Sequence, residues 1–146
     1  MSISPQTYRE MVDKSVPRSD SKVNTLIAFL VGGGICVIGQ LLRDFFTALG
    51  YTEESAGGWT SIVLVAVSAF LTGAGLYQKL ARHAGAGTLV PITGFANAIS
   101  SSAVEARSEG WVLGVGAKIF TIAGPVILYG CTAAAVYGLF YYIIST

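Results

Sequence analysis

Three consecutive glycines, Gly32, Gly33 and Gly34, stand in the middle of an apolar run long enough to cross a bilayer. A membrane-spanning helix needs about 20 predominantly apolar residues. Each glycine lowers helix propensity by roughly 1 kcal/mol relative to alanine. Backbone groups can leave helical pairing at membrane depth only where protein or a water-filled cavity satisfies them. The triplet therefore predicts a broken helix, which either exposes backbone amides to a solute or lets another helix approach closely.

The composition predicts an all-α integral membrane protein. Of 146 residues, 53% are hydrophobic and only 12% are charged, whereas charged residues make up about 25% of soluble proteins. The distribution of polar residues along the chain predicts two parts: a polar cytosolic arm over residues 1–22 and a polytopic membrane domain over 23–146. Within the arm, apolar side chains recur at helical spacing, which fits either an amphipathic surface helix or an unstructured tail. They are Tyr8, Met11, Val12 and Val16.

We expect about four membrane segments. The first covers Asn24–Leu42 and the second Trp59–Tyr77, with Trp59 and Tyr77 as interface anchors. Basic residues before the first segment and after the second place the N-terminus and the 79–87 loop in the cytosol. These residues are Arg9, Lys14, Arg18, Lys22, Lys79 and Arg82.

The remaining two segments are irregular. Segment 88–104 carries Pro91 and Gly94, which we expect to interrupt a regular helix, so it either crosses the membrane or re-enters. Segment 111–144 contains Gly124 and Pro125 and is either one kinked crossing or two half-helices. Broken or re-entrant helices are therefore part of the expected fold.

An internal repeat is suggested by two similar stretches, residues 29–39 and 120–130, which share a phenylalanine, a mid-run glycine and a closing glycine. If segment 88–104 crosses the membrane, the two copies run in opposite directions, as in many transporters. If it re-enters, they run parallel. The side on which Arg107 lies separates these alternatives.

Polar groups at helix breaks are the candidate pore- or solute-lining residues. Glu105 is either a functional acid at depth or an interface residue beside Arg107, and Lys118 either binds an anion or snorkels to the surface. The serines and Asn97 either contact a solute or join helices. The full set is Gly32, Gly33, Gly34, Gln40, Asn97, Ser100, Ser101, Ser102, Glu105, Lys118, Gly124 and Pro125, with Gly130, Ala134 and Gly138 as a helix-packing face.

No catalytic, cofactor-binding or metal-binding residue is predicted. The single histidine, His83, lies in a basic loop, and no cluster has metal-ligand spacing. A serine hydrolase pairing Ser100–Ser102 with His83 lacks any sign of an oriented base or oxyanion donors.

The sequence resembles the stage V sporulation protein AC family, SpoVAC, and its shorter relative SpoVAE, of spore-forming bacteria. The resemblance lies in residues 28–40, 85–110 and 116–126 and covers nearly the whole chain. It implies a subunit of a spore inner-membrane complex that moves dipicolinic acid, chelated with calcium, into the forespore and releases it at germination. It also implies mechanosensitive channel behaviour, and as partners an AE-type membrane subunit and the soluble AD protein.

We therefore expect part of an oligomeric pore for a small dianion or its calcium chelate, because four spans leave little interior in one chain. The alternatives are a non-conducting scaffold subunit and a proton-coupled carrier that uses Glu105.

Overall fold

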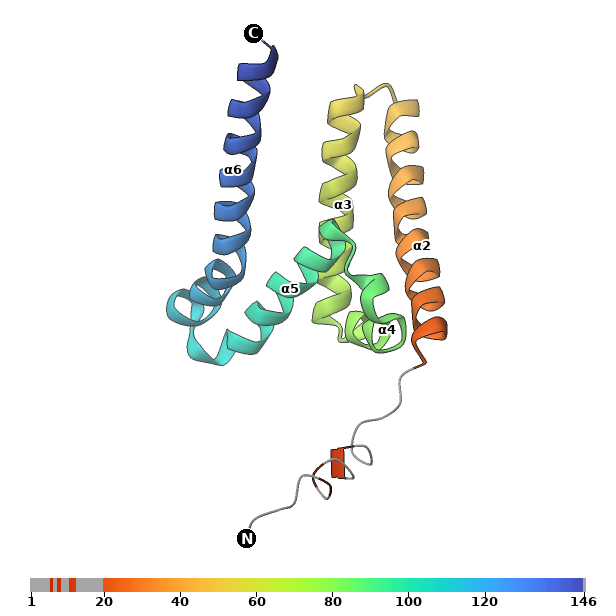
Figure 1. Ribbon diagram of the computed structural model, residues 1–146, viewed down its shortest axis with the longest axis vertical. Helices are drawn as coiled ribbons and strands as arrows, with labels where there is room; N and C mark the ends of the chain where they lie inside the picture. The colour runs from red at the N-terminus through yellow and green to blue at the C-terminus, as the bar shows by residue number, and fades with distance from the viewer. Residues whose placement is uncertain (1–5, 7, 9–10, 13–19, 146) are drawn as a thin grey trace.

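The computed structural model describes residues 6, 8, 11–12 and 20–145, and every secondary-structure element among them is a helix (Figure 1). The arm over 1–22 therefore lies largely outside the described residues. The elements in order are α2 (Ser21–Ala48), α3 (Glu53–Gly73), α4 (Leu76–Ala84), η1 (Gly85–Thr88), α5 (Pro91–Glu105), η2 (Ala106–Glu109), η3 (Trp111–Gly116) and α6 (Ala117–Ser145).

Helix α2 continues through the glycine triplet, so the predicted break at Gly32–Gly34 is wrong. The physical reason is the cost of the alternative. Leaving the helix in hydrocarbon exposes backbone groups at several kcal/mol each, which exceeds the propensity loss of about 1 kcal/mol per glycine. Gly32 faces η1 at close range, and a Cβ there would lie 3.2 Å from the Gly87 carbonyl oxygen. Gly33 and Gly34 face open space within the chain.

Helices α2 and α3 form an antiparallel hairpin closed by a short, well-specified turn (Figure 1). Gly50 has a φ of 91°, a left-handed conformation that favours glycine after a helix end. Thr52 caps α3 by accepting a hydrogen bond from the Ser55 amide, and Glu53 and Glu54 occupy the first turn, where they complement the helix dipole. The Phe46, Tyr51 and Trp59 rings gather at this end, and the interface role of Trp59 stays a prediction.

Helix α3 ends at Gly73, four residues before the predicted end of this span. Gly75, with a φ of 70°, redirects the chain into the short helix α4. The predicted interface role of Tyr77 is wrong, because its side chain is only 4% exposed and its hydroxyl donates to the Thr88 carbonyl at 2.8 Å. The Tyr77 side chain thus fastens α4 to η1.

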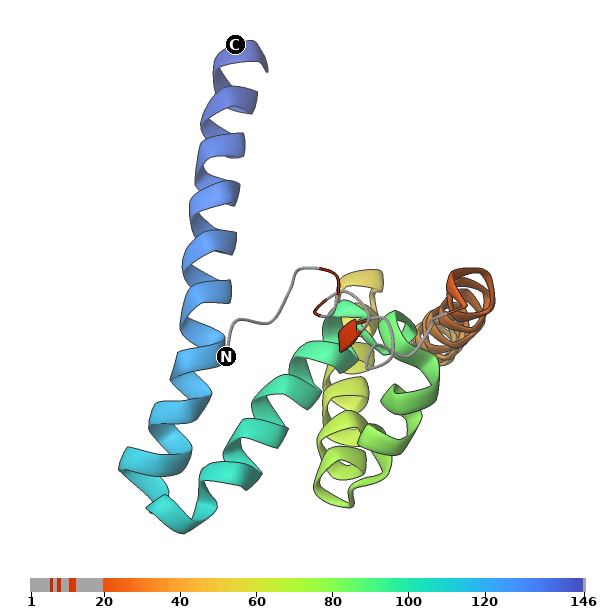
Figure 2. The ribbon, with the colours of Figure 1, turned by 60° about the horizontal axis from the view of Figure 1, so that its bottom comes forward.

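Residues 76–105 form a re-entrant segment. From α4 the chain rises to about the middle of α3, where α5 begins against α3. Helix α5 then runs obliquely toward the base of α6, at the end of the molecule at which α3 finished (Figures 1 and 2). Pro91 begins α5 instead of interrupting a helix, because the first helical position needs no backbone donor. Gly94 lies inside α5 and lets this helix approach the preceding turn closely. A Cβ at Gly94 would lie 3.1 Å from the Thr88 carbonyl oxygen.

The last run is one long helix, preceded by the π-helical turn η3, and α6 continues past Pro125. The alternative of two half-helices for segment 111–144 is therefore wrong. Arg107 lies in η2, at the same end of the molecule as Ser21, so α2 and α6 both lead away from that end with their axes inclined to one another, and the two similar stretches are not inverted (Figures 1 and 2).

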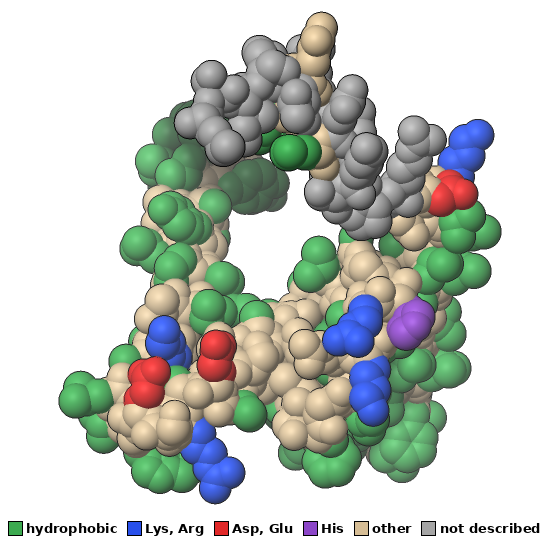
Figure 3. All heavy atoms as spheres, turned by 90° about the horizontal axis from the view of Figure 1, so that it is seen from below, with side chains coloured by type: hydrophobic (Ala, Val, Ile, Leu, Met, Phe, Trp, Pro, Cys, Tyr) green, Lys and Arg blue, Asp and Glu red, His purple; other side chains and the backbone are tan. Residues whose placement is uncertain are grey.

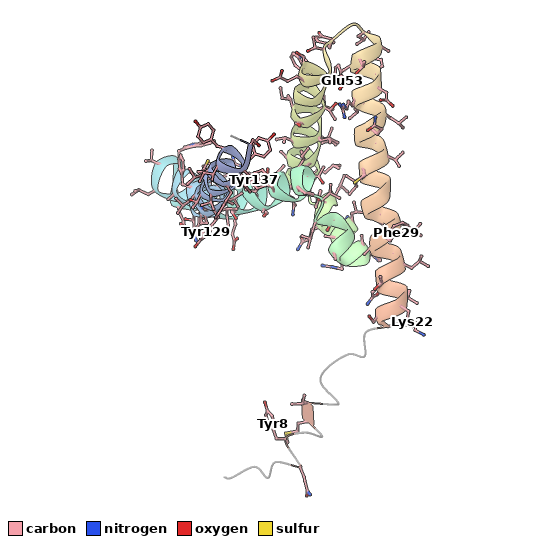
Figure 4. All side chains as sticks on the ribbon, turned by 45° about the horizontal axis from the view of Figure 1, so that its top comes forward. Tyr8, Lys22, Phe29, Glu53, Tyr129 and Tyr137 are labelled. Atoms are coloured by element: carbon pink, nitrogen blue, oxygen red, sulfur yellow. The ribbon has the colours of Figure 1, made fainter. Side chains whose placement is uncertain are left out.

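Helix α6 stands apart from α2 and α3. It packs mainly against α5 and η3 near its base, and within Ala117–Ser145 only Ala123 is buried. Figure 4 shows Tyr129 and Tyr137 on α6, away from the α2–α3 hairpin. Three helical stretches are long and apolar enough to cross a membrane: Ser21–Ala48, Glu53–Gly73 and Trp111–Ser145.

Candidate solute site beside the re-entrant helix

Helix α5 carries a polar stripe, Thr93, Asn97, Ser101 and Glu105, spaced four residues apart along one face. Residues at this spacing lie above one another on a helix. The stripe begins at the buried start of α5, where Thr93 is 7% exposed, and ends at the exposed Glu105. It therefore forms a line of polar groups from the middle of the fold to one of its ends.

Two hydrogen bonds join the upper part of the stripe to α3. The Ser68 hydroxyl, which is 1% exposed, donates to the Thr93 carbonyl at 2.7 Å, and Thr72 Oγ1 donates to Asn97 Oδ1 at 2.8 Å. The two hydrogen bonds lie one helical turn apart on both helices, so α3 and α5 run in the same direction over this stretch. Polar pairs of this kind hold membrane helices together.

Below these bonds, α3, α4 and α5 line a cavity of about 600 Å³ that is open to the outside. Its polar lining comes from Thr72 and Gln78 on one side and from Asn97, Ser101 and Glu105 on the other. These groups offer hydroxyl, amide and carboxylate oxygens together with amide N–H donors. Three of the residues predicted as solute-lining thus meet in one cavity.

A smaller cavity of about 200 Å³ lies between α5 and α6 and holds the predicted Ser102, Glu105 and Lys118, together with Glu109. Glu105 borders both cavities. Over residues 20–145 the single ion pair within 4 Å joins Arg43 and Glu53 at 3.4 Å, so Lys118 forms no ion pair with the carboxylates that line the same cavity.

A third cavity of about 460 Å³ lies between α2 and α3 at the opposite end. Its wall includes Gln40, Thr60 and Ser61, and its floor includes Val90 and Ile92 at the start of α5. Gln40 itself donates to Asp44 at 2.7 Å. The beginning of α5 therefore lies between this cavity and the one beside Asn97.

The other predicted site residues are dispersed. Gly32 contacts η1, Ser100 is half-buried on α5 outside these cavities, and Gly124 and Pro125 lie within α6. The face formed by Gly130, Ala134 and Gly138 is exposed along α6, and its role in helix packing stays a prediction.

Sequence reasoning missed Ser68, Thr72, Gln78 and Thr93. A signal was present, because Ser68 and Thr72 repeat the four-residue spacing of Thr93 and Asn97. That spacing places polar groups on one face of each helix. Only the structure could show that the two faces meet. Among residues 6, 8, 11–12 and 20–145, no three His, Cys, Asp or Glu side chains gather into a metal-binding group.

The fold and its cavities define the class: an all-helical membrane protein with three candidate spans and a re-entrant helix that carries the polar stripe. The chain belongs to the SpoVAC/SpoVAEB sporulation membrane protein family, whose model matches residues 24–140. It is 44% identical over 135 residues to stage V sporulation protein AC of Bacillus subtilis (strain 168), an alignment that covers 92% of this chain and 90% of that relative. The family expected from the sequence is confirmed. No solved structure matches the chain.

Proposed function

We propose that the protein is a transport subunit, not an enzyme, and that it conducts dipicolinate as its calcium chelate across the spore inner membrane. The observation that carries this proposal is the cavity of about 600 Å³, in which four uncharged polar side chains face a single carboxylate. They are Thr72, Gln78, Asn97 and Ser101, with Glu105 as the acid.

The charge of this cavity favours a neutral chelate over a free dianion. Dipicolinate carries two carboxylates, which Glu105 repels, whereas calcium bound between them cancels that charge. Calcium prefers oxygen ligands, and the hydroxyl and amide oxygens of the lining suit its open coordination positions. The amide N–H groups of Gln78 and Asn97 can donate to the carboxylates of the chelate.

The path is proposed to run between the cavities at the two ends of the fold, past the start of α5. In this proposal α5 tilts to join the cavities, under membrane tension or on contact with partners of the AE and AD types. The exposure of α6 supports an assembly of several subunits, because an apolar helix with one buried residue leaves most of its surface for lipid or for neighbouring chains.

The test is efflux of calcium dipicolinate from proteoliposomes that contain the full chain, alone and with its AE- and AD-type partners. Ser101→Leu places an apolar side chain in the cavity, and the Ser101 hydroxyl bonds only its own helix, to Ala98 at 3.1 Å. Polar solute groups left unpaired cost about 1–3 kcal/mol, so efflux should fall at least about fivefold. Released dipicolinate is measured by its luminescence with terbium.

Ser100→Leu is the matched control, because Ser100 neighbours Ser101 on α5 but does not line the cavity. Efflux should stay close to that of the unmodified protein. Equal efflux for Ser101→Leu and Ser100→Leu would contradict the proposed path. Absence of efflux and of tension-driven current in every combination of subunits would favour the scaffold role.

A further inference from the structure

A polar cavity of about 510 Å³ lies between the first turns of α2 and the α4–η1 corner, separate from the proposed solute path. Ser21, Asn24 and Thr25 line it from α2, and Arg82 and His83 line it from α4. Its wall therefore combines hydroxyl and amide groups with a permanent cation. None of these residues belongs to the polar stripe of α5.

Among the described residues that line the cavity none is acidic, and within residues 20–145 no carboxylate pairs with Arg82. The guanidinium of arginine presents a rigid set of donors that matches the oxygens of a phosphate. The His83 ring is held in place by Nδ1, which lies 2.9 Å from the Lys79 carbonyl. Figure 3 shows Lys and Arg side chains beside the histidine on the face at this end of the molecule.

Helix α4 has the character of a helix at a membrane surface. Tyr77 and Ala84 are buried against the protein, Leu76 and Leu80 are 48% and 41% exposed, and Lys79, Arg82 and His83 are exposed on the polar side. Such a helix sits where headgroups meet acyl chains. On α2, Phe29 is 74% exposed one turn beyond Thr25, and Lys22 precedes it (Figure 4).

We infer that this cavity binds the phosphate headgroup of an anionic phospholipid, with Arg82 as its main ligand. The exposed apolar residues beside it, Phe29 and Leu80, would contact the acyl chains. Basic pockets between membrane helices at this depth bind acidic lipid headgroups in the same way. The site does not depend on the proposed solute or on its path.

The experiment measures retention of phosphatidylglycerol and phosphatidylcholine by the full chain in a neutral detergent, using native mass spectrometry. Phosphatidylglycerol should bind more tightly than phosphatidylcholine. Arg82→Gln should weaken phosphatidylglycerol binding about fivefold, from roughly 1 kcal/mol per basic contact, and Arg82→Lys should restore part of it. Helical content by circular dichroism verifies that each variant is folded.

Lys79→Gln is the matched control, because Lys79 lies on the same exposed helix but does not line the cavity. Its effect should be clearly smaller than that of Arg82→Gln. An equal loss in both variants would mean diffuse surface attraction and would overturn the site. Inorganic phosphate or glycerophosphate that displaces the lipid at equal concentration would identify a free-phosphate site and overturn the lipid assignment. Efflux of calcium dipicolinate, measured in the same variants, reports separately on the transport proposal.

Discussion

Gly87 occupies the tightest backbone contact between η1 and α2. A Cβ at Gly87 would lie 2.5 Å from the Ala28 carbonyl oxygen and 2.8 Å from the Ala28 Cα, and both are backbone atoms that cannot rotate away. Gly32 completes this contact from the α2 side. The glycine that packs most closely at this contact is thus not in the conspicuous triplet but in η1, which meets α2 there.

We predict that Gly87→Ala lowers the free energy of unfolding by about 1–3 kcal/mol, the usual cost of overpacking a close contact. Gly33→Ala should cause no loss, because nothing within the chain lies within 4 Å of a Cβ there and alanine favours the helix. Unfolding of the purified variants in a denaturing detergent, followed by circular dichroism, measures both. Equal stability of the two variants would show that η1 does not press against α2.

Helix α5 shows that proline can begin a helix where the sequence pattern predicts that it interrupts one. Pro91 and Gly94 predicted an interruption, yet Pro91 is the first residue of α5 and Gly94 lies in its first turn. Proline is unfavourable inside a helix and favourable at its start, and the difference is set by where the preceding chain turns. That turn depends on contacts between Tyr77 and Thr88 that local sequence does not reveal.

The re-entrant course of residues 76–105 predicts which positions share a side of the membrane. In a background of Cys36→Ala and Cys131→Ala, both exposed positions, Ser21→Cys and Ser108→Cys should react with a membrane-impermeant thiol reagent from the same side. Thr52→Cys should react from the other side. If Ser108→Cys instead reacted together with Thr52→Cys, α5 would be a full crossing.

Charge is divided unevenly between the two ends of the molecule. The end that holds Ser21 and Glu105 carries most of the basic side chains of the described residues, whereas Arg43 at the other end faces several acids. The basic residues are Lys22, Lys79, Arg82, Arg107 and Lys118, and the opposing acids are Asp44, Glu53 and Glu54. Positive charge favours the cytosolic side.

With three crossings, Ser145 lies at the opposite end from Ser21 (Figure 1). We therefore predict that alkaline phosphatase fused after Ser145 is active, as it is outside the cytosol, and that the same reporter fused before Ser21 is inactive. A green fluorescent protein fused at each position provides the reciprocal measurement. Activity at both positions, or at neither, would contradict an odd number of crossings.

Hydropathy predicted the membrane class and the approximate place of three crossings, because apolar length alone determines which segments can span a bilayer. Asn97, Ser101 and Glu105 were predicted as solute-lining residues from their polarity, and the structure places them on one face of α5, but their contact with a solute stays a prediction. The sequence did not predict the extent of each helix, the burial of Tyr77 or the contact of Thr72 with Asn97, since each depends on contacts between distant parts of the chain. The break predicted at Gly33 and Gly34 was wrong because helix propensity is a weak constraint where no water competes for the backbone.

The start of α5 halfway along α3 has an electrical consequence. The first turn of a helix carries a partial positive charge, so a lone calcium ion crossing beside Val90 and Ile92 would be repelled there after being attracted by Glu105. A lone dicarboxylate would meet the reverse sequence of attraction and repulsion. Only a species whose two charges cancel would pass both points at little cost, so such a conduit would carry metal and acid in equal numbers and leave the membrane voltage unchanged.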